Sequence, residues 1–389
     1  MMTRAATPNW TTAVVPGLVS VITPCYNAAP FVGETLAAVR AQTYVPVEHI
    51  VVDDGSSDGS WAVVQAAAAE AGAAVAGGPH ARATEHMGAA ARAGAGRAAP
   101  LRAVRLAQNG GASHARNVGA ALARGEYLMF LDADDLLAPD TLAALVAAVR
   151  DRPGSMGVCS WQRLRRSRTG AWVPSPREVP LPVPGADHLR EVLAGTCWVP
   201  VHAVLWRRDV YARTGGWDET LTLDDDTDLT ARALLDGVTL VLANGGEAYY
   251  RHHGADRLST SADVFSPRTL MSQVRFADKL AARLEARGKF AEYATPLGAA
   301  YLRIAVRAYQ EGFVDLGREC QARGEQLAGG PLPVSRSRVG RLLSRVLGME
   351  RKERVMHTLA MWGLGSRERR ERGRLRNAHR ASRDRRPEA

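Results

Sequence analysis

The sequence contains little cysteine and no long apolar run. Its four cysteines are widely spaced and form no C-x-x-C pair, which argues against a zinc ribbon or a disulfide framework. We expect them to be small, buried hydrophobic residues. A membrane-spanning helix needs about 20 apolar residues, and no such run is present. The first ten residues, MMTRAATPNW, lack the apolar core of a signal peptide, so we expect a cytoplasmic protein.

Length and composition indicate a soluble globular chain. The 389 residues can form one large domain or two ordinary ones, and 46% of them are hydrophobic. The formal net charge of +10 is unevenly distributed, because the segment Arg367–Arg386 carries a large share of it. The basic isoelectric point therefore mostly describes a C-terminal tail.

Strands and helices alternate through the first half of the chain. Leu18–Thr23 is β-branched, uncharged and followed by proline, which predicts a buried strand. A helix capped by Asn27, with Pro30 in its first turn, is expected next. The further predicted strands are His49–Val52, Arg102–Leu106 and Tyr127–Leu131, and the further predicted helices are Ser60–Ala71 and Ser113–Arg124.

This β-α-β-α-β order predicts an α/β fold with a parallel, doubly wound, Rossmann-like sheet. Sheets of this kind bind ligands at the carboxyl ends of their strands. The second half is less regular. Strands are expected at Val158–Trp161 and Ala171–Val173, a helix should close the segment Gly215–Gly237, and the pattern is helical from Ser266 to Leu327.

The chain therefore divides into four parts. An N-terminal tail covers residues 1–16, and the α/β domain covers 17–262. Within this domain, the Ala/Gly-rich segment 72–100 is an insertion without recognisable chemistry. A helical, basic amphipathic region follows at 263–365, and an Arg-rich tail at 366–389. The composition of this tail predicts disorder.

Polar residues gather where the predicted strands end. Tyr26 follows the first strand, Asp53 and Asp54 follow the second, and the acidic sequence DADD at 132–135 follows the fourth. Parallel strands place their carboxyl ends at one edge, so these groups should converge. Clustered carboxylates resist burial unless they are paired or bound to a metal. Oxygen ligands suit a hard divalent cation that bridges phosphates, and an aromatic ring beside carboxylates suits a nucleotide.

Four long segments, in the same order, resemble the inverting family 2 glycosyltransferases, which have the GT-A fold. They lie within roughly residues 17 to 255 and read VSVITPCYNAAPFVGETLAAVRAQTY, IVVDDGSSDGS, NGGASHARNVGAALARGEYLMFLDADDLL and GGWDE…DDDTDLTARALLDG. A lone Asp-x-Asp is a weak signal, because aspartate is common in turns after strands. Several long motifs that occur in the family's order are a specific signal.

The resemblance implies a function and its partners. It implies a GT-A-type, mostly parallel sheet with a helical C-terminal extension. It also implies transfer of a sugar from a nucleoside diphosphate donor, which we expect to be a UDP-sugar, to an acceptor hydroxyl. The expected cofactor is Mn²⁺ or Mg²⁺. The expected acceptor is a glycan, free or lipid-linked, in the synthesis of the cell envelope or an exported polysaccharide.

The resemblance also assigns the donor site residue by residue. Thr23, Pro24 and Tyr26 resemble the segment that contacts the nucleotide, and Asp54, or its neighbour Asp53, would address the nucleobase.

Arg116 and Asn117 resemble the segment that lines the donor site, and a guanidinium at position 116 suits phosphate oxygens. Asp132 and Asp134 resemble the metal-binding pair, with Asp134 preferred as the direct ligand. His253, in the segment YRHH, resembles a late histidine that approaches the metal or the diphosphate.

Asp226 is predicted as the catalytic base. The family carries an acidic pair, a spacer and then Asp-Leu, which the segment DDTDL at 225–229 resembles. A single carboxylate would take the proton of the acceptor hydroxyl as its oxygen attacks the anomeric carbon in line, with inversion. The metal would stabilise the leaving diphosphate. Thr227 stands where the family often has a bulky aromatic residue, and neighbouring acids leave the register open, so Asp225 is the second candidate.

Several nearby residues have structural alternatives. Asp228 and Arg232 are spaced i, i+4, which favours an intrahelical ion pair over catalysis. Trp217 could shape the acceptor pocket or belong to the core, with even odds. Trp198, His202 and Trp206 lie where acceptors bind in the resembled family, although a lone histidine is more often structural.

The basic C-terminal region has two functional interpretations and one structural one. Arginines interleave with Val and Leu between residues 334 and 364, a pattern typical of a helix at an anionic membrane surface. Nucleic acid is disfavoured because the aromatic residues of a single-strand binder are absent. From Ser366 onward, a solvated disordered tail is at least as well supported.

Two other classes of protein compete with a glycosyltransferase. A sugar nucleotidylyltransferase shares the sheet topology, but it would begin with a loop rich in glycine and containing arginine, which TPCYNAAP does not offer. A non-catalytic protein that binds nucleotide-sugars or membranes could keep the fold. The intact residues Asp132, Asp134 and Asp226 argue against this second class.

Overall fold

The computed structural model describes residues 13–72, 75–77, 99–167, 169–175, 181–253, 266–331, 348–356 and 358. Most of the predicted N-terminal tail and insertion, most of the basic stretch at 334–364 and all of the Arg-rich tail therefore lie outside the described residues. The chain forms two compact units. The first comprises Met1–Leu189, Cys197–Glu219 and Asp225–His253, and the second comprises Arg190–Thr196, Thr220–Asp224 and Gly254–Ala389.

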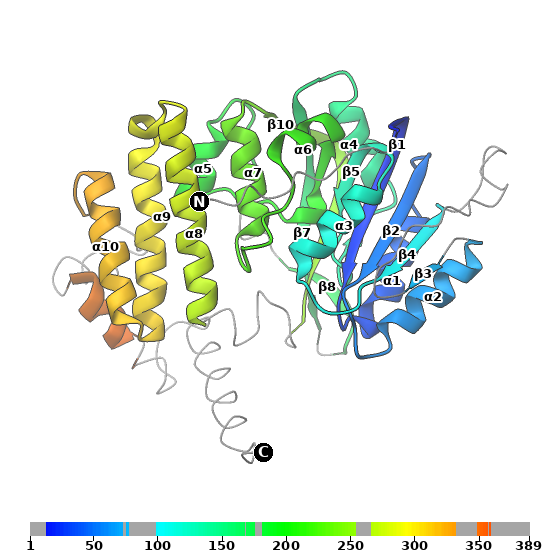
Figure 1. Ribbon diagram of the computed structural model, residues 1–389, viewed down its shortest axis with the longest axis horizontal. Helices are drawn as coiled ribbons and strands as arrows, with labels where there is room; N and C mark the ends of the chain where they lie inside the picture. Colours follow the sequence, from blue (N-terminus) through cyan, green and yellow to red (C-terminus); the bar gives the residue numbers. More distant parts are fainter. Residues whose placement is uncertain are drawn as a thin grey trace, which may run out of the picture. The chain divides into compact units, whose positions relative to one another are not determined.

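The first unit contains a ten-stranded sheet, half of which is purely parallel (Figure 1). The strand order is β3-β4-β2-β1-β5-β9-β7-β10-β6, and β8 pairs with β7. Every residue of the β2 segment VEHIVVD is buried, as expected for a strand covered on both faces. The parallel strands are β1 (Val15–Cys25), β2 (Val47–Asp53), β3 (Val75–Gly77), β4 (Leu101–Arg105) and β5 (Gly125–Phe130).

The other half of the sheet mixes strand directions. β9 (Val204–Arg207), which the sequence analysis did not predict, runs antiparallel between β5 and β7 (Ser155–Arg166). β7 pairs in parallel with β10 (Thr239–His252). Two short antiparallel strands complete it, β6 (Leu136–Leu137) and β8 (Trp172–Ser175). The sheet is mostly parallel, so the predicted α/β fold class is confirmed.

Helices cover both faces of this sheet, so it is doubly wound. Ile22 and Phe130 pack into a core with α3 (Ala112–Leu122), α6 (Arg208–Thr214) and α7 (Asp225–Leu235). Their strand neighbours Val21 and Met129 point to the opposite face, because side chains alternate along a strand. The helices on that face are α1 (Ala29–Arg40), α2 (Ser60–Glu70) and α4 (Thr141–Val149). The short α5 (His188–Ala194) and a 3₁₀ turn at Val201–Ala203 precede β9.

The predicted cap of α1 is wrong by one residue. Ala28 occupies the cap position and makes no side-chain capping bond. Asn27 instead adopts a positive φ of 48° and accepts the Ser57 N–H on Oδ1 at 2.9 Å. Its amide therefore ties the end of β1 to the loop after β2.

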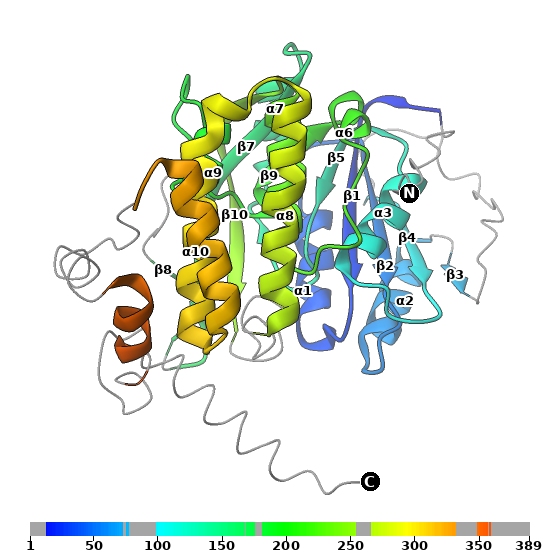
Figure 2. The ribbon, with the colours of Figure 1, turned by 60° about the vertical axis from the view of Figure 1, so that its left-hand side comes forward.

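The second unit is helical, as predicted from Ser266 onward (Figure 2). Ser266 caps α8 by accepting the Thr269 N–H. A Cβ atom on Gly298 would lie 2.6 Å from the carbonyl oxygen of Gly324, so α9 and α10 approach too closely there for any side chain. No helix among the described residues is long and apolar enough to cross a membrane. The helices are α8 (Pro267–Ala286), α9 (Phe290–Glu311) and α10 (Val314–Ala328).

Candidate active site

Three predicted strand ends lie along one edge of the sheet. The parallel register of β1 and β2 pairs Cys25 with Asp53. β5 runs beside β1, and the N–H of Leu131 donates to the carbonyl oxygen of Ile22 at 2.9 Å. The loop that begins at Asp132 therefore leaves the sheet beside the segment that carries Tyr26.

Of the three residues predicted to contact the nucleotide at the end of β1, only Tyr26 has an exposed side chain. Thr23 is fully buried, and its Oγ1 lies 2.9 Å from Nε2 of His49. Burial, with a smaller effect of Arg40, lowers the pKa of His49 to about 3, so this pair is neutral. Pro24 is also buried, whereas Tyr26 is 49% exposed and presents its ring to solvent.

Asp53 and Asp54 are both buried, and both organise loops. Asp53 Oδ2 accepts the Ser56 N–H and lies 3.3 Å from Nε of Arg105, while its Oδ1 has no hydrogen-bond partner in the described part of the chain. The two oxygens of Asp54 accept the N–H groups of Gly110 and Gly111, each at 2.8 Å. Burial raises the pKa of Asp54, and these hydrogen bonds oppose the rise.

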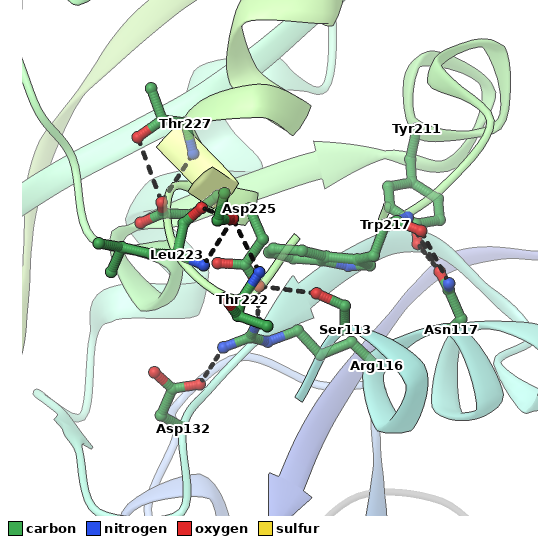
Figure 3. Close-up of polar contacts among 12 residues, drawn as sticks. Ser113, Arg116, Asn117, Asp132, Tyr211, Trp217, Thr222, Leu223, Asp225 and Thr227 are labelled. Atoms are coloured by element: carbon green, nitrogen blue, oxygen red, sulfur yellow. Dashed lines mark hydrogen bonds and ion pairs between the residues drawn. The ribbon is translucent and has the colours of Figure 1, made fainter. Parts of the chain in front are cut away.

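Arg116 joins two acidic segments that are far apart in the sequence (Figure 3). Its Nη2 donates to Asp132 Oδ1 at 2.7 Å and its Nη1 to Asp225 Oδ2 at 2.9 Å. Ser113 donates to the same oxygen of Asp225 at 2.8 Å. Burial disfavours the charge of Arg116, but attraction to the two carboxylates outweighs this effect and raises its pKa. The guanidinium is therefore a permanent internal counterion at this edge.

The side-chain amide of Asn117 forms its hydrogen bonds within the protein. Its Nδ2 donates to the carbonyl oxygen of Trp217 and to Glu219, and its Oδ1 accepts the Trp217 N–H. The Trp217 ring is 4% exposed and meets Phe130 edge-on, with ring centroids 5.1 Å apart. Trp217 is thus a core residue, over which the Arg116 guanidinium stacks at 4.4 Å.

The two remaining acids of the DADD loop also have partners. Asp134 Oδ2 lies 2.9 Å from Nε2 of His253, which brings two predicted metal-site residues together. Asp135 is fully buried, and its Oδ1 accepts the main-chain N–H of Arg251 at 2.8 Å. Its Oδ2 lies 3.1 Å from Nδ1 of His202, which is also fully buried. Each of the three aspartates therefore has its own partner, which explains how three neighbouring carboxylates can lie in one loop.

One set of described residues brings three possible ligand atoms close enough together for a metal ion, and it shares Asp132 with the predicted metal site. Ligand atoms of Asp132, Asp135 and His202 all lie within 4.8 Å of one another. However, Asp135 and His202 are fully buried, and a metal that carries a phosphate needs open coordination positions. The side chains of Asp134 and His253 are 17% and 13% exposed, and that of Asp132 is 28% exposed. The predicted residues Asp132, Asp134 and His253 are therefore more accessible to a cation that carries a substrate than Asp135 and His202 are.

The predicted base lies in the first turn of α7. Asp226 Oδ2 accepts the indole N–H of Trp198 at 3.3 Å, and Oδ1 accepts the N–H of Thr227 at 2.7 Å. Its neighbour Asp228 is buried and pairs with Arg232 at 2.7 Å, so the predicted intrahelical ion pair is confirmed.

The indole of Trp198, which bonds the base candidate Asp226, belongs to a cluster of rings. Trp198 is half-buried, and its ring meets that of Tyr250 edge-on at 5.9 Å. Tyr250 in turn stacks against the His202 ring, also at 5.9 Å. No local pattern in the sequence links His202 to Asp135 in a distant loop, so the pairing of these two residues could not be predicted. All four cysteines are free and buried, as predicted.

Comparisons with known proteins agree on one family. The family model of glycosyl transferase family 2 matches residues 20–213. The uncharacterized glycosyltransferase EpsJ of Bacillus subtilis is 26% identical over 243 residues, which cover 61% of each chain. The succinoglycan biosynthesis protein ExoU of Rhizobium meliloti is 29% identical over 234 residues, 58% of this chain and 59% of ExoU.

Among solved structures, S. aureus TarS 1–349 in complex with UDP-GlcNAc superposes with a TM-score of 0.49 at 16% identity, over 80% of this chain and 90% of that one. The chain spans 36%, 61% and 43% of the length of the first three curated relatives that it matches.

Proposed function

We propose that this chain, which belongs to glycosyl transferase family 2, is a metal-dependent, inverting glycosyltransferase. It moves a sugar from a nucleoside diphosphate donor, a UDP-sugar, to an acceptor hydroxyl. The observation that carries the proposal is the bridge from Asp132 through Arg116 to Asp225. This bridge holds the DADD loop beside the start of α7, where the base candidate Asp226 lies.

Asp226 is the better candidate for the base on local geometry. The Oδ2 atom of Asp225 already accepts bonds from Ser113 and Arg116, and an oxygen engaged by a guanidinium is a poor proton acceptor. The Oδ2 atom of Asp226 accepts a longer bond from the neutral indole of Trp198. Asp226 would take the proton from the acceptor hydroxyl as the oxygen attacks the anomeric carbon.

Asp132, Asp134 and His253 would hold the divalent cation, Mn²⁺ or Mg²⁺. Their carboxylate and imidazole groups suit these metals, and all three side chains are partly exposed. When bound, the metal supplies Lewis-acid stabilisation of the leaving diphosphate. Arg116 adds a fixed positive charge next to Asp132, which favours the same anionic product.

The donor nucleotide would lie at the ends of β1 and β2. The exposed ring of Tyr26 supports stacking against a nucleobase. Thr23, Pro24 and Asn117 would act indirectly, because their side chains are buried or bonded within the protein. Asp53 and Asp54 are buried as well, so they would address the nucleobase by positioning the loops that they bond.

We further propose a role in the synthesis of a cell-envelope or exported polysaccharide. The name of ExoU, a succinoglycan biosynthesis protein, supports this kind of pathway. A lipid-linked acceptor would also suit the basic segment at 334–364, which could hold the protein at an anionic membrane surface.

The test is thermal stabilisation of the full chain by a panel of nucleotides and nucleotide-sugars, with Mn²⁺ and with chelator. A ligand that binds only the folded state raises the melting temperature. A chelator-sensitive rise with one diphosphate-sugar, followed by sugar transfer to an acceptor, supports the proposal. Binding without any transfer favours the non-catalytic class. Release of pyrophosphate from a nucleoside triphosphate and a sugar phosphate would instead indicate a nucleotidylyltransferase.

A further inference from the structure

Arg251 is a buried guanidinium whose hydrogen-bonding capacity is only partly used. Its side chain is fully buried on β10, and Nη1 donates to Glu34 Oε2 at 2.9 Å. Neither Nε nor Nη2 has a hydrogen-bond partner among the described residues. A buried donor left unsatisfied costs about 1–3 kcal/mol, and more when it is charged. Two such donors on one side chain therefore call for an explanation.

The two unused nitrogens form a single edge of the guanidinium. Nε and Nη2 lie side by side, and their N–H bonds point in nearly the same direction. This edge matches the two oxygens of a carboxylate or phosphate, which accept two parallel bonds. Glu34 occupies the other end of the group, at Nη1, and leaves the edge open.

Aromatic rings fix the plane of this guanidinium. Its central carbon lies 5.5 Å from the centroid of Phe31 and 5.7 Å from that of Trp172, within the range of cation–π contacts. Phe31 and Trp172 thus form a cage around the Arg251 guanidinium. The guanidinium of Arg166 also stacks on Trp172, 4.8 Å from the centroid of its ring. The Arg251 guanidinium is therefore held in a defined orientation before any ligand arrives.

The outer wall of the cage consists of side chains that are partly exposed and, for Trp172, of a strand off the main path of the sheet. Trp172 and Phe31 are half-exposed, and the Glu34 side chain is 58% exposed. Trp172 lies on β8, a four-residue strand off the main path of the sheet that pairs with β7. A rotation of one of these side chains would admit an anion to the buried edge.

The cage adjoins the residues proposed to hold the metal. The Phe31 ring stacks on the His253 imidazole, with centroids 4.2 Å apart and planes 24° apart. His253 Nε2 lies 2.9 Å from Asp134. The main-chain N–H of Arg251 donates to the adjacent Asp135. An anion held by Arg251 would thus lie close to the DADD loop and to the residues proposed to hold the metal.

We propose that Arg251, caged by Phe31 and Trp172, binds an anionic group of a substrate through Nε and Nη2. The group is a carboxylate or a phosphate, and its assignment to a substrate of sugar transfer rests on the proposed function. Two sources share this chemistry: the diphosphate of the donor, and an acidic sugar or phosphate of the acceptor. No residue role proposed above for the transfer reaction includes this contact.

The experiment is isothermal titration calorimetry on the full chain with two probes, inorganic pyrophosphate in the presence of Mg²⁺ and glucuronate. Arg251→Lys keeps the charge and removes the two-donor edge, so we expect it to weaken the binding of one probe about tenfold or more. Glu34→Gln is the matched control, because it removes the internal partner and leaves the edge intact. We expect Glu34→Gln to bind that probe at least as tightly as the wild type.

The probe that is lost identifies the source of the anion. Loss of pyrophosphate binding assigns Arg251 to the donor diphosphate, and loss of glucuronate binding assigns it to an acidic acceptor. Equal affinities of wild type and Arg251→Lys for both probes would overturn the proposal, as would no binding of either probe to the wild type. If Arg251→Lys does not fold, Trp172→Leu on the outer hairpin replaces it, with an expected weakening of about threefold from loss of one cation–π wall.

The outcome is separable from that of the proposed function. The anion probes need no nucleotide, so binding that depends on Arg251 supports the subsite even when no nucleotide-sugar stabilises the chain. Conversely, stabilisation by a nucleotide-sugar that is unchanged in Arg251→Lys, together with unchanged probe affinities, supports the function and rejects the subsite.

Discussion

The side-chain amide of Asn117 bonds both main-chain groups of Trp217: Nδ2 donates to its carbonyl oxygen and Oδ1 accepts its N–H, each at 2.9 Å. An amide side chain carries a donor nitrogen and a separate acceptor oxygen, so it can bond an N–H and a carbonyl oxygen of the main chain at the same time. These two hydrogen bonds attach the loop before α7 to helix α3. The first turn of α7, which carries the base candidate, follows this loop.

Asn117→Ala should therefore loosen this loop. Removing the amide leaves the two buried main-chain groups of Trp217 unsatisfied, which costs about 1–3 kcal/mol of the free energy of unfolding. Denaturant unfolding measures the loss. Asn117→Asp is the informative companion, since it keeps the acceptor, loses the donor and adds a charge facing Glu219. A stability equal to that of the wild type in both variants would contradict this role.

Asp226→Asn should abolish sugar transfer while leaving metal-dependent donor binding intact. Loss of a general base costs about 10²–10⁴-fold in rate. Asp225→Asn should instead act through Arg116 and Ser113, with weakened stability and a smaller loss of turnover. Turnover with a saturating nucleotide-sugar, and donor affinity measured separately, distinguish the two. Unchanged turnover in Asp226→Asn would reject this residue as the base.

Arg116→Gln should destabilise the first unit. It leaves Asp132 and Asp225 facing each other without their shared counterion. Breaking a fully buried pair costs about 3–5 kcal/mol, and the partial exposure of both acids reduces this to about 1–3 kcal/mol. Arg213→Gln is a matched control, because Arg213 is half-exposed and lies 3.9 Å from Asp209. That control should change the free energy of unfolding by less than about 0.5 kcal/mol.

His49 should make the protein less stable in acid. Its pKa is about 3 in the folded chain, against an ordinary value of 6.5, because burial disfavours the imidazolium. Between these values the unfolded chain binds a proton that the folded chain does not, so the free energy of unfolding falls as the pH falls. The slope from one proton is about 1.4 kcal/mol per pH unit. His49→Gln should remove this contribution in denaturant unfolding measured from pH 7 to pH 4, and an unchanged slope would contradict it.

The same substitution should have opposite effects at two helical glycines. Gly298→Ala places a methyl group 2.6 Å from a carbonyl oxygen of α10, so we expect a loss of about 1–3 kcal/mol in the helical unit. Gly33→Ala on α1 meets its nearest neighbour, Val63, at an ordinary 3.8 Å. Alanine favours the helix there by about 0.8–1 kcal/mol. Thermal unfolding of the two variants, compared with the wild type, tests both signs.

Four of the five parallel strands could be predicted from the sequence for a clear physical reason, whereas β3 lies in the segment 72–100 that was interpreted as an insertion. In β2, for example, the buried apolar run Ile50–Val52 ends at the acidic residues Asp53 and Asp54 and then at Gly55. β9 was missed because its four residues, VLWR, are too short to show a period. Their strand conformation comes from pairing with β5 and β7, which is a tertiary effect.

The candidate site likewise has features that could be predicted from the sequence and features that could not. The gathering of Tyr26, Asp53 and the DADD loop follows from the carboxyl-end rule for parallel strands. The hydrogen-bond and ion-pair partners of individual side chains do not follow from any local pattern. Asn117 turned out to hold a loop, and His202 to pair with Asp135, through contacts between residues that are distant in the sequence.

Because β9 runs against its neighbours, its first residues, not its last, lie at the edge where β5 ends. The polypeptide before β9, including Trp198 and His202, therefore enters the site from the opposite chain direction to the loops that follow β1, β2 and β5. This incoming segment pairs with the sheet only through β9, whose partners are the antiparallel neighbours β5 and β7. The edge is therefore built from chain segments of opposite direction, those that leave the parallel strands and one that leads into β9.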